Sequence, residues 1–149
     1  MSRYVLNNQG GNQIINRATA LTATTKCLWG SMTVDEMLFH CNLTNQEILK
    51  AQPYEKLPKF KQRFFKYLVM RILKKLPKNV KINPKFLKQA QQELDFEIEK
   101  NKFIETINQF IKREGAIYGK HPFFGKLNTD EWRHFVWMHM DHHLRQFGV

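Results

Sequence analysis

Apolar residues recur along most of this chain at intervals of three and four, the spacing that gathers them on one face of an α-helix. The periodicity predicts four helices, which run from Thr33 to the break at Pro53, over 58–76, over 83–115 and over 128–146. The alternation of apolar and polar residues that indicates β-strands is nearly absent. We therefore expect an all-α protein, and the modest connections between the helices favour a four-helix bundle.

Local signals mark the ends of these helices. Thr33-Val-Asp-Glu36 and Asn128-Thr-Asp-Glu131 have the form of a capping box, in which two side chains satisfy free amides of the first turn. Asn83-Pro84 is typical of a helix start, and Gly115 is typical of a helix end. Three of the four predicted helices therefore have a start signal in the sequence.

The first 32 residues have a weaker pattern. We expect an irregular lead-in over 1–32 with one short helix near Gln13–Leu21, followed by the bundle over 33–147. A length of 149 residues is about that of one globular domain, so 1–149 is predicted to form a single domain. The residues expected to face the core from the second and third helices are Phe64, Leu68, Val69, Ile72, Leu73, Leu76, Leu87, Ala90, Leu94, Ile98, Ile104, Ile107 and Ile111.

The chain is strongly basic, with 24 Lys plus Arg against 13 Asp plus Glu and a formal net charge of +11. The excess is concentrated between Lys56 and Gln92, where there are twelve basic residues and no acidic one. Such a segment suits a nucleic acid or another polyanion. A solvated helix face is the favoured interpretation, because the aromatic residues of the segment sit among apolar ones at helical spacing. These aromatic residues are Phe60, Phe64, Phe65 and Tyr67.

No stretch of about 18 apolar residues is present, so we expect no membrane span and no membrane partner. The first ten residues lack the apolar stretch of a secretory signal, and two cysteines, Cys27 and Cys41, make no disulfide framework. These features predict a cytoplasmic protein. Cys41 follows His40 directly, but adjacent residues of a helix point about 100° apart. A buried, unreactive Cys41 is therefore favoured over a nucleophile.

Histidines provide the strongest candidate chemistry. His139 and His143 lie four residues apart in the last predicted helix, so both imidazoles project from one face and can reach a single metal ion. That face is otherwise apolar, which directs the pair toward the core. His40 lies on or beside the apolar stripe of the first long helix and also faces inward. Three inward histidines on two helices predict a metal site with at least one open coordination position.

The remaining histidines have less definite roles. For His142, a role in supporting the ligands and a position on the surface are equally favoured. His134 is predicted to face solvent. His121 lies in an aromatic loop, where it either lines a pocket or bonds locally. No carboxylate has a spacing that marks it as a general base. The candidate acceptors for the second ring N–H of the ligands are Asp141, Gln146 and Asn42.

Together these residues resemble the DinB/YfiT-like superfamily, and within it an uncharacterised bacterial branch with an HPFFG-type loop. The resemblance rests on Trp29-Gly30-Ser-Met-Thr33, Met37-Leu38-Phe-His40-Cys41, His121-Pro-Phe-Phe-Gly125, Glu131-Trp132 and the ending His139-Met-Asp-His142-His143-Leu-Arg-Gln146. These motifs follow one another in the expected order from Trp29 onward, whereas residues 45–115 match in pattern only. One departure is Arg145, which stands where such endings often have glycine.

The resemblance implies a DinB-like four-helix bundle with up-down-down-up topology. It also implies a divalent metal ion, usually zinc or nickel, on one histidine of an early helix and two of the last. These positions correspond to His40, His139 and His143. Members of the superfamily with known activity include transferases and isomerases that use low-molecular-weight thiols, and others are suspected metal-dependent hydrolases.

The resulting interpretation is a metal-binding protein that acts on a small molecule. If it is an enzyme, a metal-dependent thiol S-transferase is the favoured activity. A hydrolase of the same fold is one alternative, and a non-enzymatic basic module that binds nucleic acid or another polyanion is the less favoured one. The residues expected to line the pocket or to support the metal site are His121, Phe124, Trp29, His142 and Gln146. Pairing of two copies as a homodimer stays open.

Overall fold

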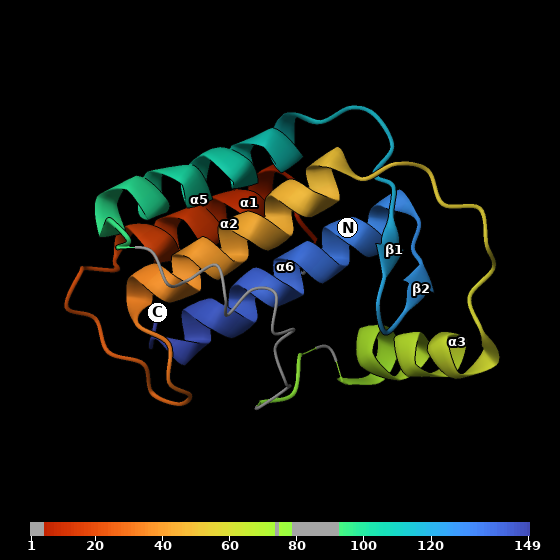
Figure 1. The fold of residues 1–149 in the computed structure, drawn as a ribbon, viewed down its shortest axis with the longest axis horizontal. Helices are drawn as coiled ribbons and strands as arrows, with labels where there is room; N and C mark the ends of the chain where they lie inside the picture. Colours follow the sequence, from red (N-terminus) through yellow and green to blue (C-terminus); the bar gives the residue numbers. More distant parts are fainter. Residues whose placement is uncertain (1–4, 74, 79–92) are drawn as a thin grey trace.

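The computed structural model describes residues 5–73, 75–78 and 93–149, and these residues are mostly helical (Figure 1). The helices are α1 (Asn8–Thr19), α2 (Val34–Lys50), α3 (Phe60–Tyr67), which continues as a π-helical segment over Leu68–Leu73, α5 (Phe96–Lys112) and α6 (Thr129–Gln146). A small antiparallel hairpin pairs β1 (Lys120–His121) with β2 (Gly125–Lys126). The prediction of a mainly helical protein is confirmed, apart from this hairpin.

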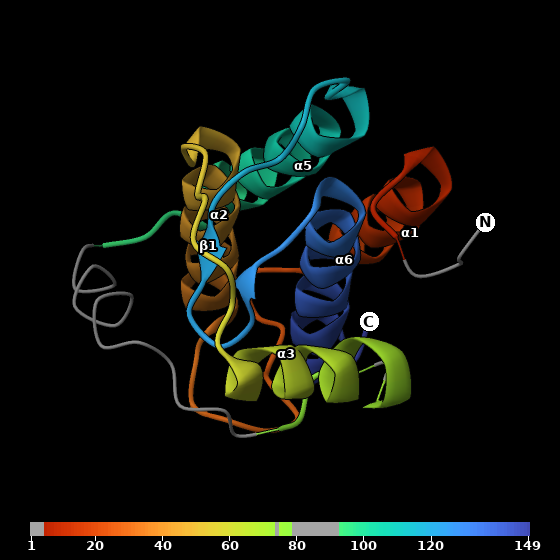
Figure 2. The same ribbon diagram turned by 90° about the vertical axis from the view of Figure 1, so that its right-hand side faces the viewer.

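Helices α1, α2, α5 and α6 lie alongside one another and enclose the core (Figures 1 and 2). Helix α5 packs on α1 and α2, and α6 also packs on both. Every residue of α6 from Phe135 to Asp141 is buried. The packed helices therefore differ from the predicted four, since α1 takes the place that was expected for the helix over 58–76.

Helix α1 begins at Asn8, several residues before the short helix expected near Gln13–Leu21, and it packs as closely as the longer helices. Gly10 and Gly11 are buried in it, and a Cβ at Gly11 would collide with the side chain of Ile111 on α5. Besides the buried side chains of Ile14 and Ala18, this packing depends on glycines that have no side chain. It therefore leaves little trace in the pattern of apolar residues.

Helix α3 lies outside the packed helices and runs across them, joined to α6 by an ion pair of 2.7 Å between Lys66 and Glu131 (Figure 2). The helical pattern of this segment is confirmed from Phe60 to Leu73. Only a narrow stripe of the segment, including Val69 and Met70, is buried. The expected burial of the remaining stripe is wrong for three side chains that are exposed, Phe64, Ile72 and Leu73.

Helix α5 begins at Phe96, where the Asp95 carboxylate accepts the N–H of Ile98 at 2.9 Å and caps the first turn. Residues 93–95 are not helical and α5 ends at Lys112, so the predicted helix over 83–115 is too long at both of these places. The predicted start and the inward residues further upstream lie outside the described residues, namely Asn83, Pro84, Leu87 and Ala90. Ile98 is 53% exposed, so its predicted burial is wrong. The core side chains of α5 are Phe103, Ile107 and Phe110.

Both predicted capping boxes are present. The N–H of Thr33 donates to the Glu36 carboxylate at 2.8 Å, and the N–H of Glu36 donates back to the Thr33 hydroxyl at 3.4 Å. Asn128 and Glu131 form the same pair of contacts at 2.9 and 2.8 Å. These boxes fix the first turns of α2 and α6, the two helices that carry the candidate metal ligands.

Candidate metal centre

Helices α2 and α6 bring the three histidines predicted as ligands into one cluster. His139 and His143 lie one turn apart on α6, and His40 lies on the facing side of α2. The Nε2 atom of His139 is 3.1 Å from Nε2 of His40 and 3.1 Å from Nε2 of His143. One ring nitrogen from each histidine lies within 4.8 Å of those of the other two. The fold therefore joins His40 to a residue 99 positions further along the chain.

The three rings meet edge-on. Their centroids are 4.7 to 5.1 Å apart, and the angles between ring planes are 73° to 83°. Stacked rings would point their nitrogens past one another, whereas crossed rings can direct three nitrogens at one point. This arrangement therefore allows the three histidines to act as ligands of one metal ion.

Three neutral imidazoles cannot satisfy one another in this geometry. Each neutral ring has one N–H and one lone pair. Nε2 of His139 faces the Nε2 atoms of both His40 and His143, so a single proton or a single lone pair at His139 satisfies one contact only. A cation between the three nitrogens satisfies all of them.

Gln146 determines which nitrogen of His143 is available. Its side-chain amide donates to the carbonyl oxygen of Trp29 at 2.8 Å, so its Oε1 turns toward His143 and accepts the Nδ1–H at 2.9 Å. This leaves the lone pair of His143 on Nε2, which is the form that a metal ligand needs. Gly30 makes room for the contact, since it has a φ of +83° and a Cβ there would lie 2.6 Å from Nε2 of Gln146. Gln146 thus contacts His143, and its support of a metal ligand stays a prediction.

Burial keeps the cluster neutral. Loss of hydration lowers the pKa of His40 to about 4 and the pKa of His143 to about 3. It also lowers the pKa of His139 well below 6.5, and the neighbouring imidazoles act in the same direction. Because the neutral imidazole is the form that binds metal, the cluster is ready for a cation at neutral pH without releasing protons.

The residues fit a divalent transition-metal ion. In tetrahedral zinc sites the Zn–N distance is about 2.0–2.1 Å, which places neighbouring ligand nitrogens about 3.3 Å apart. The two separations of 3.1 Å come close to that spacing. Imidazole suits zinc, nickel, copper and iron, and three protein ligands leave a position for a non-protein ligand.

A cavity of about 530 Å³ is lined by all three histidines. Its wall is mostly apolar and comes from α2, α6, the segment around α3, the loop before α2 and the hairpin. The residues predicted to line the pocket all do so, namely Trp29, His121, Phe124, His142 and Gln146. The volume is within the range of small-molecule sites.

His121 presents an N–H group in this wall. The backbone N–H groups of Phe123 and Phe124 each donate to its Nδ1 at 3.2 Å, so the neutral ring carries its proton on Nε2. Burial lowers the pKa of His121 to about 4, which keeps the ring neutral. The ring stacks on Phe124 and meets Phe135 edge-on, and Phe135 stacks in turn on His139. One aromatic ring therefore separates this N–H donor from the cluster of His40, His139 and His143.

The two other histidines of α6 lie outside the cluster. His142 is half-buried, and its ring lies edge-on to those of Trp29 and His143. Burial lowers the pKa of His142, while a hydrogen bond with the backbone of Leu76 opposes this shift. His134 is half-buried, so the prediction that it faces solvent is wrong.

Two of the three predicted supporting residues have other partners. Asp141 forms ion pairs of 2.8 Å with Arg17 and with Arg145. The side-chain amide of Asn42 donates to the carbonyl and the carboxylate of Glu99 at 2.9 and 2.8 Å. Among the described contacts, neither residue touches a histidine of the cluster.

Cys41 follows His40 on α2 and is fully buried. Its Sγ lies 3.8 Å from the Sδ of Met37, and burial raises the pKa of the Cys41 thiol far above its usual range. A protonated, enclosed thiol is a poor nucleophile. The predicted burial of Cys41 is confirmed, and its lack of reactivity stays a prediction.

Among the cavity residues that were not predicted are two polar ones of α2. Thr44 and Glu47 follow His40 on α2 by four and seven residues, and both line the cavity. This spacing, which places residues on one helix face, was the available signal. The Thr44 hydroxyl donates to the carbonyl of His40 at 3.0 Å. Glu47 brings a carboxylate into the wall of the cavity.

A family profile described as "Protein of unknown function (DUF1569)" matches residues 1–148 of the chain. The chain belongs to this family. No curated protein and no solved structure matched it. The DUF1569 match spans the three histidines and the whole cavity lining, and it agrees with the prediction of an uncharacterised family. The relation to the DinB-like superfamily stays a prediction.

Proposed function

We propose that this chain is a DinB-like metalloprotein that binds one divalent ion, zinc or nickel, through His40, His139 and His143. The observation that supports this is the convergence of three neutral imidazoles in the wall of a cavity, two of whose Nε2 atoms lie 3.1 Å from the third. The topology that we assign to the helices is the up-down-down-up bundle implied by the sequence resemblance.

Transfer of a low-molecular-weight thiol to an electrophile is the reaction that we favour. A divalent ion held by three imidazoles supplies Lewis acidity, which stabilises the thiolate form of a bound thiol at neutral pH. In such a transfer a sulfur–carbon bond forms, the bond to the leaving group breaks, and the proton of the thiol passes to solvent.

The residues of the cavity suit a substrate with an anionic or carbonyl oxygen. The Nε2–H of His121 can donate to such an oxygen, while the rings of Trp29 and Phe124 restrict water. Lys120 also lines the cavity, and Nζ of Lys78 lies 4.3 Å above the centre of the Trp29 ring. These ammonium groups attract a thiol that carries carboxylates.

Elemental analysis of protein purified without an affinity tag tests metal binding. We expect about one equivalent of metal in the wild type and none in His40→Ala or His139→Ala, since two imidazoles bind much more weakly than three. His142→Ala is the matched control because it adjoins His143 and lines the same cavity, and it should retain the ion. Absence of metal after reconstitution with zinc and with nickel would refute the site.

A conjugation assay tests the reaction separately. Metal-loaded protein should accelerate the coupling of a carboxylate-bearing thiol to an electrophile, and His139→Ala should not. Binding of metal without acceleration for any cellular thiol would reject thiol transfer and leave the metal site standing.

Hydrolysis by the same metal site is the second candidate, and the position of Glu47 favours it. This carboxylate shares a face of α2 with His40 and lines the cavity, where a general base for water would be needed. Loss of a hydrolytic activity in Glu47→Gln, with metal content unchanged, would support hydrolysis. Thiol transfer should survive this substitution.

A further inference from the structure

The segment from Leu57 to Leu73, which contains α3, carries most of the exposed large apolar side chains in the described part of the chain. Seven of these eleven side chains lie there, namely Leu57, Phe60, Phe64, Phe65, Tyr67, Ile72 and Leu73. Leu57 is 86% exposed and Phe60 is 83% exposed. Contiguous exposed apolar patches of this kind mark sites of interaction with proteins or membranes.

Two polar contacts hold the inner side of α3 against the rest of the protein. The side-chain amide of Gln62 donates to the carbonyl of Pro122 at 3.3 Å, and Lys66 pairs with Glu131 at 2.7 Å. These contacts connect α3 to the hairpin and to α6. They determine which side of the helix remains outside.

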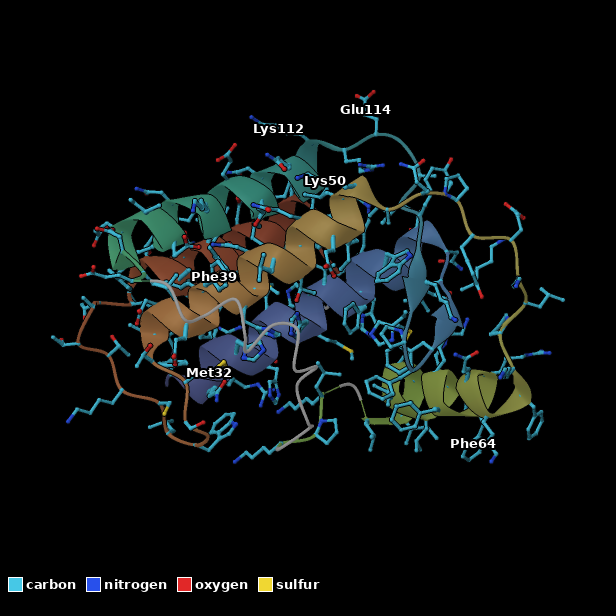
Figure 3. All side chains as sticks on the ribbon, viewed as in Figure 1. Met32, Phe39, Lys50, Phe64, Lys112 and Glu114 are labelled. Atoms are coloured by element: carbon cyan, nitrogen blue, oxygen red, sulfur yellow. The ribbon has the colours of Figure 1, made fainter. Side chains whose placement is uncertain are left out.

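The outer side of α3 is an apolar stripe. Phe60, Phe64 and Tyr67 follow the spacing i, i+4 and i+7, and we call these three residues the outer α3 face. Figure 3 shows Phe64 on the side of α3 that is turned away from the other helices. Phe123 of the hairpin is also exposed, and its ring centroid lies 6.3 Å from that of Phe65, which widens the apolar surface.

Basic side chains border the outer α3 face. Lys61 and Arg63 flank it on the two sides of the helix, Arg71 continues it by one turn, and all three are exposed. From Lys56 to Gln92 the sequence contains twelve basic residues and no acidic one. An apolar stripe with cationic borders is the pattern of a helix that lies in the interface of an anionic bilayer.

Two other partners fit this surface less well. A second copy of the chain, related by a two-fold axis, would bring the basic borders of two α3 helices against each other. A nucleic acid would match the charge and the aromatic rings, but it offers nothing to the exposed aliphatic side chains of Leu57, Ile72 and Leu73. An anionic bilayer matches both the charged and the aliphatic groups.

We propose that the outer α3 face docks this protein on an anionic phospholipid bilayer. Phe60, Phe64 and Tyr67 enter the boundary between headgroups and acyl chains, and the basic side chains contact lipid phosphates. The helix lies on the membrane surface, and within the described ranges no helix is long and apolar enough to cross a bilayer. The expectation of no membrane partner came from the lack of an apolar span, which does not bear on a surface helix.

Docking in this way places the cavity next to the lipid surface. Phe65 of α3 and Val69 of the following π-helical segment line the cavity. One helix, whose diameter with side chains is about 10–12 Å, therefore separates the cavity lined by the three histidines from the bilayer.

Co-sedimentation of the full chain with phospholipid vesicles tests the proposal. We expect binding to vesicles with about one-third phosphatidylserine, and at least about tenfold weaker binding to pure phosphatidylcholine. Phe60→Ser combined with Phe64→Ser should lower the partition coefficient about tenfold or more, because two large apolar side chains leave the interface. Lys61→Glu combined with Arg63→Glu should weaken binding comparably and reduce its dependence on ionic strength.

Leu28→Ser combined with Ile98→Ser is the matched control, since these side chains are 70% and 53% exposed outside α3, and it should leave vesicle binding unchanged. His139→Ala should also bind vesicles like the wild type, so that failure of the metal site and failure of docking can be told apart. Equal binding to both lipids, or no effect of the phenylalanine exchange, would overturn the proposal. A solution dimer that separates on this exchange, or tighter binding to duplex DNA than to anionic vesicles, would also overturn it.

Discussion

The Nδ1–H of His143 donates to Oε1 of Gln146 at 2.9 Å, and this contact fixes the chemical role of the ring. The other end of the Gln146 amide is held by the carbonyl of Trp29, so the amide cannot rotate to offer its NH₂ group to the histidine without losing that bond. The loop before α2 thus selects the tautomer of a side chain on α6. His40 on α2 and His143 on α6 belong to one cluster, and this loop adds a second connection between their helices.

Replacing Gln146 by Leu removes the acceptor for Nδ1–H of His143. We expect metal affinity to fall about 10–100-fold, as for other residues that orient metal-binding histidines. Competition with a chromophoric chelator measures this. Gln109→Leu, an exposed change on α5, is the control. Unchanged affinity in Gln146→Leu would show that the hydrogen bond does not support the ligand.

Replacing His121 by Leu should destabilise the protein without removing the metal. The backbone N–H groups of Phe123 and Phe124 lose their acceptor, and an unsatisfied buried donor costs about 1–3 kcal/mol. Urea unfolding measures the loss, and elemental analysis should still find about one equivalent of metal. Phe123→Leu changes an exposed side chain of the same loop and should alter stability by less than about 0.5 kcal/mol. Loss of the metal in His121→Leu would instead place His121 among the ligands.

Stability of the metal-free protein should fall as the pH drops below about 6.5. The unfolded chain takes up protons near the ordinary histidine pKa of 6.5, whereas burial lowers the pKa of His40 and of His121 to about 4 in the folded protein. Between these pKa values the unfolded state binds more protons, so the free energy of unfolding decreases with falling pH. Each imidazole contributes roughly 2 kcal/mol of loss between pH 6.5 and 5.

Urea titrations at pH 7.5 and pH 5 with a chelator present measure this pH dependence. In His121→Leu the difference between the free energies of unfolding at pH 7.5 and pH 5 should be smaller by the contribution of one imidazole, roughly 2 kcal/mol. Equal stability at both pH values would contradict the burial of neutral histidines. Above about pH 8 these groups are neutral in both states and contribute no slope.

Asp141→Asn tests whether Asp141 stabilises the fold through its ion pairs or supports a metal ligand, as predicted from the sequence. Its carboxylate pairs with Arg17 and Arg145, so we expect a loss of about 1–3 kcal/mol in unfolding free energy with unchanged metal affinity. Asp130→Asn, an exposed change at the start of α6, should cost less than about 1 kcal/mol. Weaker metal binding in Asp141→Asn alone would restore the role predicted from the sequence.

The elements that could be predicted from the sequence are those determined by local chemistry. The capping boxes at Thr33 and Asn128 depend on side chains three residues apart, and both appear in the structure. The apolar faces around His40 and His139 are likewise local, and they direct both histidines toward the space between α2 and α6. Convergence of the three imidazoles follows from these faces once the two helices pack together.

The remaining features depend on contacts between distant segments. Packing of α1 relies on Gly11 lying against a side chain of α5, and the sequence around it is too polar to reveal this. The exposure of Phe64 depends on α3 crossing the other helices, a placement that helical periodicity does not contain. The tautomer of His121 is set by two backbone N–H groups of the hairpin loop, and the sequence pattern does not contain this conformation.

The cluster also has a consequence for the order of events during synthesis. His139 follows His40 by 99 residues, so at about 5–20 residues per second it is translated roughly 5–20 s later. During this interval the nascent chain holds one imidazole of the three and cannot chelate an ion. On the metal site that we propose, loading would therefore require α6 to have docked against α2, so that only chains with this helix in place would take up the ion. In a cell where zinc or nickel is scarce, incompletely folded chains would withdraw little of it.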